Sequence, residues 1–93
     1  MVTAVVLLTV QRERIAQVAE ALADMPEVTE VYSVAGKFDL VALVRVGVNE
    51  DLADLVTDRM VKLEGILDTE TLIAFRAYAR RDLDAGFALG ADG

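Results

Sequence analysis

The sequence contains one pattern twice, and this repetition constrains the fold more than any other feature. Each copy has an apolar β-branched run, then an amphipathic stretch, then a more polar run. The first copy begins at Val2 and the second at Phe38, and the corresponding segments are offset by about 36 to 38 residues. Two such units in tandem predict the element order βαββαβ. In a chain of 93 residues, neither half is large enough to bury its own apolar residues, so we expect both halves to share one sheet.

Four segments are predicted to be strands. Residues 2–10 and 38–46 are apolar at both even and odd positions, which is typical of strands buried on both faces. Residues 27–35 and 66–75 mix polar and apolar side chains and therefore fit edge strands. The two apolar strands should accordingly lie in the centre of the sheet.

Two segments have the three- and four-residue spacing of amphipathic helices. The first covers residues 12–24 and ends before Pro26, which cannot continue a helix. The second is predicted to begin at Asn49 as its N-cap and to end at Gly65 as its C′ residue. The apolar stripes are Ile15, Val18, Ala19 and Leu22 in the first helix, and Leu52, Leu55, Val56 and Leu63 in the second.

These elements predict an α+β fold of the ferredoxin-like βαββαβ type. It has a four-stranded antiparallel sheet with two helices on one face. The other face of the sheet has no helix to cover it, and a soluble monomer seldom exposes so large an apolar surface. With 55% hydrophobic residues in the chain, we expect a second copy to cover this face by sheet-on-sheet packing. A homo-oligomer built on a dimer follows.

The composition limits the chemistry that the chain can perform. It contains no Cys and no His, so disulfides, thiolate nucleophiles, imidazole bases and the usual transition-metal ligands are excluded. The acidic residues between positions 50 and 58 fit a helix N-terminus and its solvated face better than a metal site. Nothing in the sequence shows a second group placed to perturb the pKa of a carboxylate. We therefore expect neither an enzyme, nor a metal site, nor a cofactor.

The charge of the chain limits its partners. Sixteen Asp and Glu residues against nine Lys and Arg residues give a net charge of -7, which disfavours direct binding to nucleic acid or to acidic membranes. The apolar start lacks a basic flank and is too short to span a bilayer. We expect a cytoplasmic location.

Residues 35–39 form the most informative loop. Gly36 permits a tight turn, and Asp39 places a carboxylate at the start of an apolar strand. Backbone N–H groups beside a carboxylate can hold a zwitterion. The alternative is that Gly36 serves only the turn and Asp39 only satisfies backbone donors. Thr69 and Thr71 leave a similar choice between a polar pocket and a solvated sheet edge.

Three motifs occur in a fixed order: PEVTEVY at residues 26–32, GKFDL at residues 36–40, and Gly65 followed by TETLI at residues 69–73. In this order and spacing they resemble the effector-binding, or RAM, domain of the Lrp/AsnC transcriptional regulators. The resemblance extends over residues 3–75. Members of that family carry a DNA-reading helix-turn-helix before this domain. Because the chain begins at the first strand, it resembles a stand-alone RAM protein.

The resemblance implies an oligomerising regulatory domain that binds a small molecule, an amino acid in many members. It also implies dimers formed through the sheets, rings of such dimers, and a ligand held between dimers near the glycine–x–x–aspartate step. Ala35 departs from the small polar residue that often precedes that glycine. The ligand-binding residues implied are Ser33, Ala35, Gly36, Asp39, Thr69 and Thr71.

Two other functions stay open at this point. One is a small dimeric ferredoxin-like enzyme of the cofactor-free monooxygenase or isomerase type. The other is a subunit that co-assembles with full-length Lrp/AsnC relatives. We expect residues 1–78 to form the effector-binding and oligomerisation domain and residues 79–93 a C-terminal tail. The stretch from Arg76 to Gly93 is expected to contact a neighbouring surface through its spaced apolar residues Tyr78, Leu83, Phe87 and Leu89.

Overall fold

The structure, a computed structural model, describes residues 1–80. The tail expected at residues 79–93 lies outside the described residues from position 81 onward, and so do Leu83, Phe87 and Leu89. The elements in chain order are β1 (Val2–Val10), a 3-10 turn (Arg12–Arg14), α1 (Ile15–Ala23), β2 (Val28–Ser33), β3 (Leu40–Val46), α2 (Asn49–Asp54), a π turn (Leu55–Arg59), a second 3-10 turn (Met60–Lys62) and β4 (Ile66–Ile73).

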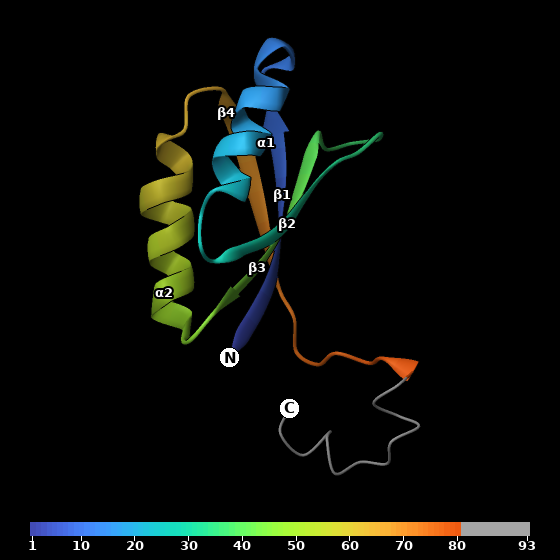
Figure 1. Cartoon of the computed structure of the whole chain (residues 1–93), viewed down its shortest axis with the longest axis vertical. Helices are drawn as coiled ribbons and strands as arrows, with labels where there is room; N and C mark the ends of the chain where they lie inside the picture. The colour runs from blue at the N-terminus through green and yellow to red at the C-terminus, as the bar shows by residue number, and fades with distance from the viewer. Residues whose placement is uncertain (81–93) are drawn as a thin grey trace.

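The four strands form one antiparallel sheet in the order β2-β3-β1-β4. The two most apolar strands, β1 and β3, lie in the centre, and the two more polar strands lie at the edges. Both helices lie on the same side of the sheet (Figure 1). The prediction of a ferredoxin-like α+β fold is therefore confirmed.

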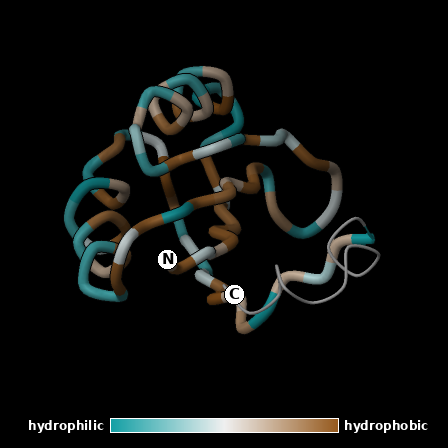
Figure 2. The backbone as a smooth tube through the Cα atoms, turned by 60° about the horizontal axis from the view of Figure 1, so that its bottom comes forward, coloured by the Kyte–Doolittle hydropathy of each residue, from teal (hydrophilic) through white to brown (hydrophobic). Residues whose placement is uncertain are grey.

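The core lies between the sheet and the helices. Along β1 the even-numbered residues from Ala4 to Val10 are buried, and Val6 and Leu8 pair with the buried residues Ala42 and Leu40 of β3. Val18 and Leu22 of α1 and Leu52 of α2 close this core from the other side. The central strands are mostly hydrophobic along their length, whereas the helices change character from one side to the other (Figure 2).

The opposite side of the sheet is only partly covered within one chain. We call it the open face. It follows the odd-numbered residues of β1 and β3, which are partly exposed, together with their cross-strand partners on β2 and β4. Its apolar residues are Val5, Leu7, Tyr32, Val41, Leu43 and Leu72. The central strands, predicted to be buried on both faces, are thus fully buried on one.

Two details of the second helical segment differ from the prediction. Val48, not Asn49, is the N-cap, because Val48 keeps the extended backbone that a cap needs while Asn49 is already helical. Among the described residues, no side chain caps this helix by a hydrogen bond. Met60 is fully buried although it lies outside the predicted stripe. Its N–H donates to the carbonyl of Leu55, five residues earlier, so the wider π turn brings Met60 onto the buried side.

Gly65 lies in the turn before β4, two residues after the C-cap Leu63, and not at the predicted C′ position. Its φ is +108°, and its carbonyl accepts a hydrogen bond of 2.8 Å from the N–H of Gln11. A Cβ at this position would lie 2.9 Å from Cδ of Arg14. The glycine therefore allows β4 to begin tightly against the start of α1. Within residues 1–80, no helix has both the length and the apolar character needed to cross a membrane.

Candidate functional site

The loop between β2 and β3, residues 34–39, projects from one end of the sheet (Figure 1). Gly36 has a φ of +133°, and no atom of the described residues lies within 4 Å of the place where a Cβ would sit. The turn thus requires the backbone freedom of glycine, and the space beside Gly36 is open within residues 1–80. The N–H of Val34 donates to the carbonyl of Asp39 at 3.0 Å and closes the base of the loop.

Asp39 connects this loop to the central strand. Its Oδ2 accepts a hydrogen bond of 2.8 Å from the N–H of Val10, and its own N–H donates to the carbonyl of Leu8 at 2.9 Å. Within residues 1–80, no donor reaches Oδ1, the other carboxylate oxygen. The geometry therefore fits both roles considered for Asp39, in the sheet and in ligand binding. One oxygen satisfies a backbone donor, and the other is available to a cationic group.

The loop also presents unused backbone donors. In the described part of the chain, the N–H groups of Ala35, Gly36 and Lys37 have no acceptor. The side chain of Lys37 lies over the ring of Phe38, with Nζ 5.9 Å from its centroid. Neighbouring backbone N–H groups can hold a carboxylate, and a carboxylate such as that of Asp39 can hold an ammonium. The loop therefore has the two kinds of group that an amino acid needs.

The six residues expected to bind the ligand do not meet at one point in a single chain. Ser33, Ala35, Gly36 and Asp39 lie in or beside the loop, whereas Thr69 and Thr71 lie on β4. The register places Ser33 opposite Leu40, Leu40 opposite Leu8, and Leu8 opposite Thr69. Three strand spacings of roughly 4.8 Å separate Ser33 from Thr69, about 14 Å in all. The central strand β1 lies between the loop and the threonines.

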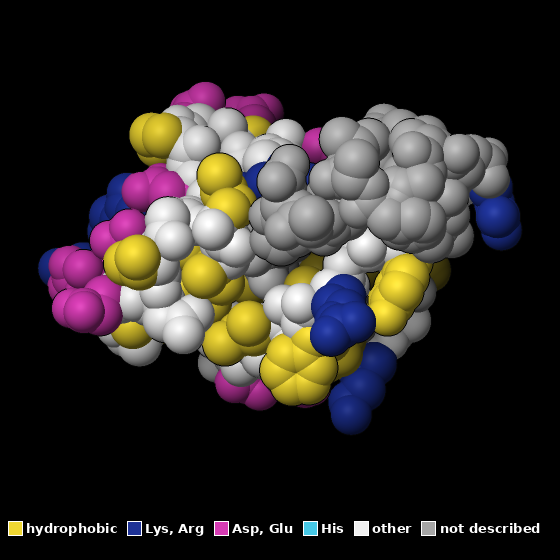
Figure 3. Space-filling view, turned by 90° about the horizontal axis from the view of Figure 1, so that it is seen from below, with side chains coloured by type: hydrophobic (Ala, Val, Ile, Leu, Met, Phe, Trp, Pro, Cys, Tyr) yellow, Lys and Arg dark blue, Asp and Glu magenta, His cyan; other side chains and the backbone are white. Residues whose placement is uncertain are grey.

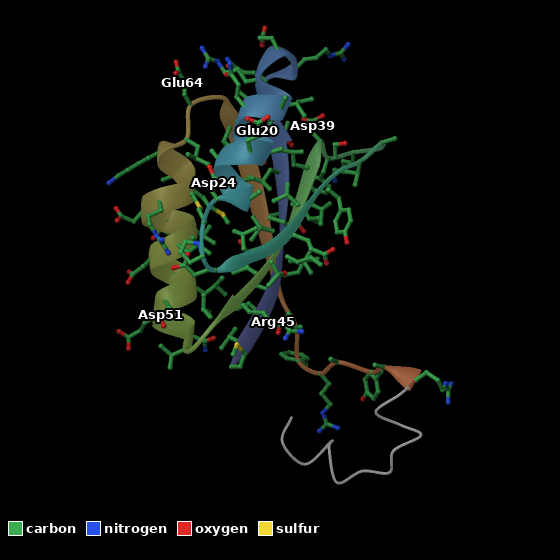
Figure 4. The ribbon with its side chains drawn as sticks, in the orientation of Figure 1. Glu20, Asp24, Asp39, Arg45, Asp51 and Glu64 are labelled. Atoms are coloured by element: carbon green, nitrogen blue, oxygen red, sulfur yellow. The ribbon has the colours of Figure 1, made fainter. Side chains whose placement is uncertain are left out.

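A concavity lies at the end of the sheet opposite to this loop. Figure 4 shows Arg45 and Asp51 at that end and Asp39 at the opposite one. The concavity has a volume of about 450 Å³. Its lining residues are Pro26, Glu27, Arg45, Val46, Gly47, Asp51, Asp54 and Arg59. None of the six expected ligand residues lies there.

An ion pair between Glu27 and Arg59 crosses this concavity. The hydrogen bond from Arg59 lowers the pKa of the Glu27 carboxyl, and the same bond raises the pKa of Arg59. Oε1 of Glu27 is buried and has no hydrogen-bond partner within residues 1–80. The sequence does not indicate this pair, because 32 residues separate its members and both types are ordinary surface residues. Only the packing of the second helical segment beside the start of β2 brings them together.

The described residues give no sign of a metal site. Within residues 1–80, no group of three or more Asp and Glu side chains is arranged to hold a metal ion. Asp51 and Glu50 lie in the first turn of α2, as expected for acidic residues at a helix N-terminus.

Comparison with known proteins points to regulators. The family model described as the Lrp/AsnC ligand binding domain matches residues 3–83. An HTH-type transcriptional regulator of Pyrococcus abyssi (strain GE5 / Orsay) is 37% identical over 59 residues, which are 63% of this chain. The match covers 39% of that regulator, so the chain spans well under two thirds of its length.

Solved structures share the fold of this chain. TTHA0845 from Thermus thermophilus is 52% identical to this chain, with a TM-score of 0.81, and the match covers 86% of this chain and 100% of that one. A transcriptional regulator from Neisseria meningitidis, solved in complex with L-Met, shares the fold with a TM-score of 0.78 at 14% identity. That match covers 85% of this chain and 53% of the regulator.

Proposed function

This chain belongs to the Lrp/AsnC ligand binding domain family, and we propose that it is a self-associating domain that binds an amino acid. The curated relatives that it matches are transcriptional regulators and not enzymes. The observation that carries the proposal is the loop at residues 34–39. It offers three unused backbone N–H groups beside a carboxylate whose Oδ1 has no donor within residues 1–80. The ligand carboxylate would be held by the N–H groups near Gly36, and its ammonium by Asp39.

The position of the threonines supports a site completed by a second copy. In a single chain, β1 lies between Asp39 and the two threonines, and both β3 and β1 lie between Ser33 and Thr69. In the proposed assembly, these hydroxyls come from a neighbouring copy. The Neisseria regulator was solved with L-Met, and this supports an amino acid as the class of ligand.

The open face supports self-association. Its apolar residues lie on all four strands, and two of them, Tyr32 at 46% and Leu72 at 48%, are about half-exposed in a single chain. Packing of two such faces would remove this surface from water and would resemble the core of a β-sandwich. A dimer is the smallest assembly that covers it.

A thermal-shift screen of the twenty amino acids tests the binding proposal. A ligand at 100 times its Kd should stabilise the folded state by about 2.7 kcal/mol. For a domain of this size, each kcal/mol corresponds to roughly 4–8 °C in Tm. Asp39→Asn should lose the shift, because Asn removes the charge but can still accept from Val10. Asp51→Asn, at the other end of the sheet, should keep it. An equal shift in wild type and Asp39→Asn would place the ligand elsewhere.

A further inference from the structure

The segment that follows β4, residues 74–80, has an unusual surface. At its start, the N–H of Ala74 donates to the carbonyl of Thr3 at 2.9 Å. Beyond that point the chain runs away from the sheet (Figure 1). Phe75 is 100% exposed and Tyr78 is 75% exposed. Aromatic side chains are seldom left in water to this extent, so the segment has the character of a surface that meets a partner.

The charge of this segment is opposite to that of the rest of the domain. Residues 1–73 contain six Lys and Arg residues and thirteen Asp and Glu residues, a net charge of -7. Residues 74–80 contain Arg76 and Arg80 and no acidic residue. Seen from this end of the molecule, yellow apolar side chains and dark-blue cationic ones lie next to each other (Figure 3). A carboxylate beside apolar surface is the complement of such a segment.

The domain has a surface of this kind on its open face. A groove of about 240 Å³ lies at the end of the sheet from which residues 74–80 depart. Leu43 supplies apolar surface, Glu30 a carboxylate, and Arg45 a guanidinium that can stack on an aromatic ring. Thr3 and Thr29 complete its polar edge. The full exposure of Phe75 shows that this side chain does not fill the groove of its own chain.

We propose that residues 74–80 of one copy dock in the groove of a second copy, beside Leu43 and Glu30. This inference rests on the proposed self-association through the open face. Phe75 would cover Leu43, and Arg76 would approach Glu30. A nucleic acid or an acidic membrane is a poorer partner, because the -7 charge of residues 1–73 repels both.

Symmetry makes this exchange possible in one arrangement of the dimer. A twofold axis parallel to the strands, lying between two open faces, stacks β4 of one copy over β2 of the other. Such an axis keeps corresponding strand ends together. On one side of β1, Ala4 pairs with Ile73 of β4. On its other side, Ala4 pairs with Val44 of β3, which in turn pairs with Val28 of β2. The end of β4 and the groove therefore lie at the same end of the sheet. An axis perpendicular to the strands would instead bring the segment toward Thr9, at the other end.

Engineered cysteines test the exchange against a background without native thiols, because the chain contains no Cys. Full-length Phe75→Cys is mixed with a tagged chain that carries Thr29→Cys, and disulfide formation is followed on a non-reducing gel. The matched control is a tagged chain with Thr9→Cys, on the same face at the far end of β1. Docking should make the Thr29→Cys pair form about tenfold faster or more, because docked thiols have a high effective concentration.

The assembly mass, measured by light scattering on the same mixtures, separates this inference from the proposed self-association. A dimer without preferred cross-linking to Thr29→Cys, or with faster cross-linking to Thr9→Cys, overturns the docking and leaves the dimer. A monomer overturns both. A second variant, Phe75→Ala with Tyr78→Ala, alters only exposed side chains and should raise the dimer Kd about tenfold. An unchanged Kd, or a single-stranded oligonucleotide retained by wild type and lost in this variant, also overturns the proposal.

Discussion

Oδ2 of Asp39 lies 2.8 Å from the backbone nitrogen of Val10 and accepts its hydrogen, so the carboxylate that precedes β3 closes the end of β1. The N–H of Asp39 and the carbonyl of Leu8 form a second link between the same two strands, 2.9 Å long. Asp39 is thus part of the sheet as well as a candidate ligand-binding residue. Variants at this position have to separate the two roles.

Asp39→Ala should destabilise the ligand-free domain by about 1–3 kcal/mol, because it leaves the N–H of Val10 without its charged acceptor. Asp39→Asn should cost less, since its amide oxygen can still accept that hydrogen. Urea unfolding of both variants without ligand measures the difference. Equal losses of unfolding free energy in the two variants would show that the hydrogen bond accepted from Val10 does not account for the lost stability.

Gly65→Ala should destabilise the domain more than Gly36→Ala. Both glycines have a positive φ, and this backbone costs a residue with a Cβ on the order of 1–3 kcal/mol. Only at Gly65 would the new Cβ also meet a neighbour within the described residues, lying 3.0 Å from Cβ of Arg14. Thermal unfolding of the two variants, compared with wild type, tests this order. Gly36→Ala as the less stable variant would contradict it.

Most of the fold could be predicted from the sequence because each strand and helix has its own signal. The apolar runs of β1 and β3 identified the central strands, and the mixed runs of β2 and β4 identified the edges. The burial of Met60 could not be predicted, because the π turn shifts it away from the regular helical period. The N-cap of α2 lies one residue before the predicted position, because the extended chain after β3 continues through Val48.

The candidate site was less accessible to sequence reasoning. The loop around Gly36 was recognisable from its residues, but the hydrogen bond between Asp39 and Val10 joins positions 29 apart that no periodic pattern connects. The separation of Ser33 from Thr69 follows from strand order, which a list of motifs does not contain. Whether Thr69 and Thr71 take part in binding stays a prediction, because their proposed partner lies in another copy.

The ion pair between Glu27 and Arg59 should make part of the stability depend on pH. The pKa of Glu27 is lowered in the folded state, so its contribution is fully present above the unfolded pKa, about 4.3, and is lost as pH falls through the folded value. Glu27→Gln should therefore reduce the urea midpoint at pH 7, and its difference from wild type should shrink as the pH is lowered toward 3. Glu64→Gln, in an ion pair whose carboxylate side chain is 78% exposed, should have the smaller effect at pH 7. A loss in Glu27→Gln that is equal at both pH values would contradict the linkage.

The open face should be sensitive to charge in a way that other exposed apolar positions are not. Leu72 and Val61 are matched in exposure, at 48% and 53%, but Leu72 pairs with Val5 on the open face, whereas Val61 lies in the 3-10 turn after α2. Leu72→Arg should shift the assembly toward monomers at micromolar concentration, because the dimer would bury an unpaired guanidinium. Val61→Arg should leave the mass unchanged. Light scattering measures the mass, and circular dichroism confirms that both variants fold. A folded Leu72→Arg protein that keeps the wild-type mass would show that the subunits associate through another surface.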